Sequence, residues 1–92
     1  MVTAIVLMNI EPKRINDVAQ ALVDIPGISE VYSVGGRFDL VAIIRVKDND
    51  ELARVVTEKS LKIEGITSSE TLIAFRAVSR HDLERLFAIG SE

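Results

Sequence analysis

Apolar residues dominate two segments of the chain, 2–10 and 40–46, and few polar side chains interrupt either of them. Short runs of β-branched and aliphatic residues are typical of strands that are buried on both faces. Two further runs, 28–34 and 67–78, are also strand-like, although the second begins with five polar residues. The pattern therefore predicts four strands.

Between the runs 2–10 and 28–34, apolar residues recur with the period of a helix. Pro12 suits a first helical turn, and Pro26 with Gly27 ends the segment. The predicted buried stripe, at intervals of three and four residues, consists of Ile15, Val18, Ala19, Leu22 and Val23.

A second helix is predicted between the third and fourth strands. Asp48 stands three residues before Glu51, an arrangement that caps free backbone amides at a helix start. The buried stripe is expected at Leu52, Val55 and Val56, and Gly65 closes the segment. A short last helix is predicted over residues 82–89.

The two halves of the chain repeat the same order of elements. Ile25, Gly27 and Ile28 recur 38 positions later as Ile63, Gly65 and Ile66. Each half reads strand, helix, strand, which gives βαββαβ overall. With right-handed crossovers, this order predicts an α+β, ferredoxin-like sandwich with an antiparallel sheet in the order 4-1-3-2, plus the short C-terminal helix.

The central strands of this predicted sheet are apolar on both faces. One alternating set contains Ile5, Leu7, Val41 and Ile43, and the other contains Ala4, Val6, Ala42 and Ile44. Helices of this fold cover only one face, so several hundred Å² of aliphatic surface would remain open, more than monomers usually expose. We therefore predict a homodimer formed through the sheet faces.

Composition narrows the class of protein further. The chain has 92 residues, which suits one domain over 1–92, and a formal net charge of −3. That charge offers no basic field for phosphates, so direct nucleic-acid binding is not expected. The apolar run 2–10 is shorter than the roughly 20 residues that a membrane-spanning helix needs. We expect a cytoplasmic protein with no membrane contact.

Little in the chain suggests catalysis or a metal. The sequence has no cysteine, and His81, the one histidine, stands without a carboxylate cluster around it. Asp48 and Asp50 are explained by helix capping. We expect no catalytic residues, no metal site and no cofactor.

The most informative polar residues follow a pair of glycines, Gly35 and Gly36, between the second and third strands. Paired glycines favour a tight hairpin, because positive φ is cheap only without a Cβ. Asp39 at the hairpin exit has two interpretations of equal weight. In the first, its carboxylate accepts backbone amides of the glycine loop in an Asx turn. In the second, the carboxylate fixes the loop or binds a ligand ammonium group. Phe38 is expected to pack into a subunit interface.

Hydroxyl groups begin the fourth strand, at Thr67, Ser68, Ser69 and Thr71. The simplest interpretation is that these hydroxyl groups keep an edge strand of the sheet soluble. Alternatively, they bind the carboxylate and ammonium groups of a small zwitterion. In the 4-1-3-2 order the hairpin and this strand start lie at the same end of the sheet, and contact across a subunit interface is the easier geometry.

Three motifs together resemble those of the effector-binding module of Lrp/AsnC transcription regulators, the RAM domain. The motifs are Ile25-Pro26-Gly27-Ile28, Gly36-Arg37-Phe38-Asp39, and Ile63-Glu64-Gly65-Ile66 followed by Thr67 to Thr71. The resemblance implies facing-sheet dimers, assembly into octamers or similar rings, and amino-acid effectors bound between dimers. It implies ligand-binding roles for Gly36, Phe38, Asp39, Thr67, Ser69 and Thr71. Leu40 stands at a position where members of that family often have a tyrosine.

Full-length members of that family carry an N-terminal helix-turn-helix domain, whereas here the sheet begins at once. We therefore expect a stand-alone form or an isolated domain, which senses an amino acid and modulates assembly or a DNA-binding Lrp/AsnC regulator. Two alternatives share the topology: a dimeric ferredoxin-like barrel enzyme and an ACT-like regulatory module that pairs sheets edge to edge. Only Arg45, Arg76 and terminal polar residues could supply polar groups for catalysis on the sheet face, so we predict a protein that is not an enzyme.

Overall fold

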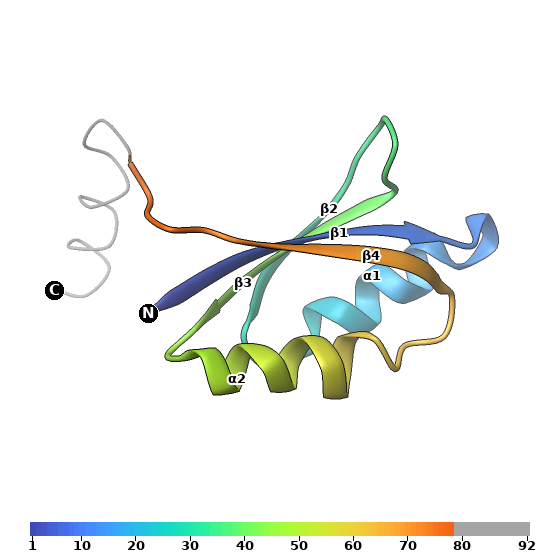
Figure 1. Cartoon of the computed structure of the whole chain (residues 1–92). Helices are drawn as coiled ribbons and strands as arrows, with labels where there is room; N and C mark the ends of the chain where they lie inside the picture. Colours follow the sequence, from blue (N-terminus) through green and yellow to red (C-terminus); the bar gives the residue numbers. More distant parts are fainter. Residues whose placement is uncertain (79–92) are drawn as a thin grey trace, which may run out of the picture.

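The computed structural model describes residues 1–78 of the chain, and Figure 1 shows how its elements are arranged. They follow in the order β1 (Val2–Ile10), η1 (Pro12–Arg14), α1 (Ile15–Val23), β2 (Ile28–Ser33), β3 (Leu40–Val46), α2 (Asn49–Ala53), η2 (Arg54–Ser60) and β4 (Ile66–Ile73). The strands form one antiparallel sheet in the order β2-β3-β1-β4. This is the predicted order 4-1-3-2 read from the other edge, so the predicted fold is confirmed.

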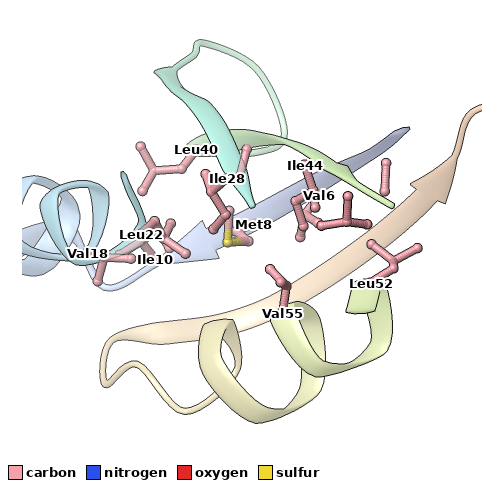
Figure 2. Close-up of a cluster of buried hydrophobic side chains, with 13 residues drawn as sticks. Val6, Met8, Ile10, Val18, Leu22, Ile28, Leu40, Ile44, Leu52 and Val55 are labelled. Carbon is pink, nitrogen blue, oxygen red and sulfur yellow. The ribbon is translucent and has the colours of Figure 1, made fainter. Parts of the chain in front are cut away.

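Both helices lie on one side of the sheet (Figure 1). Every second residue of β1 and β3 points toward them, and all of these residues except the partly buried Val2 are buried. Figure 2 shows these side chains meeting those of the helices, including Val18, Leu22, Leu52 and Val55. The strict alternation follows from the pleat, which sends successive side chains to opposite faces.

The helical stripe of α1 is confirmed except at its last position. Val18 and Leu22 are fully buried, whereas Val23 is 42% exposed. Residue 23 lies about 100° around the helix from Leu22 and therefore falls at the edge of the stripe. Pro12 begins a 3₁₀ turn, η1, that leads into α1.

The second helix begins at the predicted cap. The Asp48 side chain accepts a hydrogen bond from the Glu51 amide at 2.8 Å. From Arg54 onward the helix widens into π-helical turns, in which the Leu61 amide donates to the Val56 carbonyl at 3.0 Å. Leu52 and Val55 are buried as predicted, and Val56 is half-buried. The widened turns were not predicted.

The fourth strand ends at Ile73 and does not extend to Val78 as predicted. Its last link to the sheet is the hydrogen bond from the Ala74 amide to the Thr3 carbonyl, 2.9 Å. Beyond Thr3 only Val2 of β1, and Met1 before it, remain for β4 to pair with. The predicted helix at 82–89 and His81 lie outside the described residues.

The face of the sheet opposite the helices remains uncovered within residues 1–78. From the strand register it carries an aliphatic centre, which we call the open face: Ile5, Leu7, Val41, Ile43 and Leu72. Leu72 is 45% exposed and the other four are half-buried. No helix in this part of the chain is long and apolar enough to cross a membrane.

Candidate functional site

The β2–β3 hairpin projects from the sheet, as Figure 1 shows. Ser33 pairs with Leu40 at its base, and the Val34 amide donates to the Asp39 carbonyl at 3.0 Å. Gly36 adopts φ +114°, a conformation that L side chains rarely take. No heavy atom within residues 1–78 lies within 4 Å of where a Cβ would stand on either hairpin glycine. The tip is therefore open to a ligand or to another subunit.

Asp39 makes a contact that the sequence did not reveal. Its Oδ2 accepts a hydrogen bond from the Ile10 amide at 2.8 Å, and its own amide donates to the Met8 carbonyl at 2.9 Å. Within the described residues, no amide of the glycine loop donates to this carboxylate. The carboxylate therefore binds the backbone of β1 and does not form the predicted turn within the glycine loop. The other interpretation, a ligand contact, stays a prediction.

Phe38 is half-buried next to Asp39. The guanidinium carbon of Arg37 lies 5.7 Å from the centroid of its ring, within the range of a cation–π contact. Packing of Phe38 into a subunit interface stays a prediction.

The hydroxyl groups of β4 divide between two faces. Ser69 pairs with Met8 and Thr71 with Val6, which places both on the helix side of the sheet. Ser68, opposite Asn9, belongs to the other side and accepts a hydrogen bond from the Asn9 side chain at 3.0 Å.

Thr67 lies at an irregularity in the β1–β4 register, and its hydroxyl donates to the Asn9 carbonyl at 3.1 Å. Ser68 was not among the predicted site residues. Its place in the same hydroxyl run was the only sequence signal for it.

The hairpin exit and the start of β4 flank the same end of β1. Met8 is paired with Leu40 on one side and with Ser69 on the other. Two strand spacings separate those partners, roughly 10 Å. The two segments therefore lie on either side of β1, near the same end of that strand.

A hollow of about 260 Å³ lies at the opposite end of the sheet. Its lining residues are Met1, Thr3, Arg45, Ala74, Phe75, Arg76 and Ala77. None of the six predicted ligand-binding residues contributes to it. Thr3 and Arg45 are paired across β1 and β3 on the open-face side of the sheet, so a partner packed on that face would cover the hollow.

Three polar side chains border the open face, Glu30 and Tyr32 from β2 and Arg45 from β3. The Tyr32 hydroxyl donates to Glu30, and an Arg45 guanidinium nitrogen lies 3.4 Å from the other Glu30 oxygen. The Tyr32 hydrogen bond, and then Arg45, lower the pKa of Glu30. The same bond to Glu30 raises the pKa of Tyr32, because ionising the phenol would remove the donated proton and place two negative charges together.

These shifts predict a pH dependence that is simple to observe. Tyr32 is the one tyrosine of a chain without tryptophan, so ultraviolet absorbance reports its ionisation alone. We expect its midpoint to lie above that of free tyrosine and to fall back toward it in Glu30→Gln.

The same pKa shifts determine how the free energy of unfolding changes with pH. The contribution of Tyr32 is present below its unfolded-state pKa and is lost as pH rises through the folded-state value. The contribution of Glu30 is present above its unfolded-state pKa and is lost as pH falls through the folded-state value. An unshifted tyrosine midpoint in the wild type would contradict the hydrogen bond.

A βαββαβ chain with both helices on one face of its antiparallel sheet and an open aliphatic face on the other defines a ferredoxin-like α+β domain. The family model of the Lrp/AsnC ligand binding domain matches residues 3–83. The chain belongs to this family. The family is regulatory and not enzymatic, in agreement with the predicted absence of catalysis.

Individual relatives agree with this assignment. The uncharacterized HTH-type transcriptional regulator PH1916 of Pyrococcus horikoshii is 32% identical over 79 residues, which cover 83% of this chain and 53% of that protein. The chain thus spans about half the length of the curated relatives it matches.

Solved structures share the fold. The crystal structure of TTHA0845 from Thermus thermophilus matches with a TM-score of 0.82 and 46% identity, covering 87% of this chain and 100% of that one. The complex of the transcriptional regulator NMB0573 from Neisseria meningitidis with L-Met matches with a TM-score of 0.77, covering 86% of this chain and 53% of that one. At 14% identity the second match concerns the fold alone.

Proposed function

We propose that this chain is an effector-binding domain that takes up a small amino acid at subunit interfaces of a homo-oligomer. The observation that carries the proposal is the position of two segments on either side of one end of β1. The glycine hairpin and the hydroxyl-bearing start of β4 flank Met8 in a member of a ligand-binding family.

The proposed site has two walls. Gly36, Phe38 and Asp39 form the hairpin wall, and Thr67, Ser69 and Thr71 form the β4 wall. Open backbone amides and hydroxyl groups suit a ligand carboxylate, and hydroxyl and backbone carbonyl oxygens suit an ammonium group. The L-Met bound to NMB0573, a protein of the same fold, supports amino acids as the class of ligand.

The proposed assembly begins with a dimer through the open face. Five aliphatic side chains there have no cover within residues 1–78, and a second copy supplies a matching surface. Dimers then join into an octamer or a similar ring, so that hairpins from neighbouring dimers complete the ligand sites.

In this proposal residues 1–92 act as one domain in the cytoplasm. Ligand occupancy changes assembly, or the choice of a DNA-binding Lrp/AsnC-type partner, through different affinities for two quaternary states. Half of each curated relative lies beyond the region that this chain matches, and regulators of that kind are the proposed partners.

A thermal-shift screen against the proteinogenic L-amino acids, with native mass spectrometry in parallel, tests the proposal. We expect at least one amino acid at millimolar concentration to raise the melting temperature and to change the distribution of oligomers. D-enantiomers of the hits serve as controls. Absence of any shift across the panel would rule out an amino-acid effector.

A further inference from the structure

Three side-chain hydrogen bonds converge on the last two residues of β1. Asp39 Oδ2 accepts from the Ile10 amide at 2.8 Å. On the other side, the Thr67 hydroxyl donates to the Asn9 carbonyl at 3.1 Å, and the Asn9 side chain donates to the Ser68 hydroxyl at 3.0 Å. One bond comes from the hairpin and two come from β4.

The regular backbone ladder is interrupted at this place. Pairing between β1 and β3 ends at Met8 and Leu40, and the β1–β4 register shifts between Asn9 and Ile10. Ile10 is only 4% exposed, so an amide there without a partner would carry a desolvation penalty. Asp39 supplies that partner from a residue 29 positions away.

We propose that Asp39 is a positioning residue, which holds the hairpin wall at a fixed separation from the β4 wall through the Ile10 amide. β4 is tied to the neighbouring Asn9, so one short segment of β1 sets the geometry of both walls. In this role Asp39 acts as a hydrogen-bond acceptor, and its negative charge is not required. The ligand-related part of the inference rests on the proposed function.

The pair Asp39→Asn and Asp39→Ala separates an acceptor from a charge. Asparagine keeps a carbonyl oxygen of the same reach for the Ile10 amide, whereas alanine leaves that amide unpaired. A contact with a ligand ammonium group would instead depend on charge and would be weakened by both substitutions. Asp24→Ala, at an exposed aspartate outside both walls, serves as the control.

The first measurement needs no ligand. Amide hydrogen exchange of Ile10, followed by NMR, is expected to be slow in the wild type, in Asp39→Asn and in Asp24→Ala. In Asp39→Ala it is expected to be about tenfold faster or more, since the acceptor is gone. Unchanged protection of Ile10 in a folded Asp39→Ala protein would overturn the proposal.

The second measurement uses each proteinogenic L-amino acid that shifts the melting temperature of the wild type. Affinity by calorimetric titration is expected to fall about tenfold or more in Asp39→Ala and to stay within about threefold of wild type in Asp39→Asn. Equal loss in both variants would overturn the positioning role and assign Asp39 to the ligand ammonium. If no amino acid binds the wild type, the proposed function fails, and Ile10 exchange in Asp39→Ala compared with Asp39→Asn still decides the role of Asp39.

Discussion

Replacing Ile43 with glutamate is expected to convert the proposed homodimer into a folded monomer. Ile43 pairs with Ile5 at the middle of the open face and packs against none of the helices. A dimer through this face would bury the new carboxylate without a partner in both copies. At about 3 kcal/mol for each, the dimer would be roughly 10⁴-fold weaker.

Light scattering coupled to size-exclusion chromatography measures this change, and circular dichroism verifies that the monomer is folded. Gln20→Glu adds the same charge to an exposed position of α1, on the covered side of the sheet, and is expected to leave the dimer intact. A dimer that survives Ile43→Glu would instead favour edge-to-edge pairing, as in ACT-like modules.

Alanine at Gly27 or Gly65 is expected to destabilise the fold by about 2 to 4 kcal/mol each, through backbone strain and overpacking together. Gly27 has φ +102°, and a Cβ there would stand 3.0 Å from a methyl of Val46 and 3.2 Å from a methyl of Val55. Gly65 has φ +110°, and its Cβ would stand 3.0 Å from Arg14 and from Val18. Neither set of neighbours is free to move away, because Val18, Val46 and Val55 are buried.

The hairpin glycines provide matched controls for this prediction. Gly36→Ala meets the positive φ but no steric contact, so a cost of about 1 kcal/mol is expected. Gly35→Ala meets neither and is expected to stay within about 0.5 kcal/mol of wild type. Urea unfolding gives all four values. If Gly35→Ala lowered the free energy of unfolding as much as Gly65→Ala, positive φ and steric contact would not explain the differences among the four variants.

These contacts also give the internal repeat a physical meaning. Gly27, after the first helix, packs against Val55 of the second helical segment, and Gly65, after that segment, packs against Val18 of the first. The two halves therefore exchange contacts crosswise. The sequence repeat predicted two equivalent helix exits, and only the folded chain shows that each exit rests on the helix of the other half.

The candidate site was predictable in part. Asp39 was identified from its place after a glycine hairpin, but its partner, the Ile10 amide, lies in another strand and no local pattern indicates it. The hydroxyl run of β4 was identified as a unit, yet Ser69 and Thr71 share the helix side whereas Ser68 belongs to the other side. A shift of register by one residue reverses which face each side chain occupies, and the irregularity opposite Asn9 and Ile10 lies beside this run.

The sequence by itself determined the order of elements, the sheet order and the presence of an open aliphatic face. These properties follow from the periodicity of apolar residues within single segments and from the handedness of the connections between them. Both depend on interactions between residues close in sequence. Tertiary structure decided where β4 ends, which face each hydroxyl group occupies and which amide the hairpin carboxylate holds. Those outcomes depend on the register between strands distant in sequence, and register is fixed only when the strands pair.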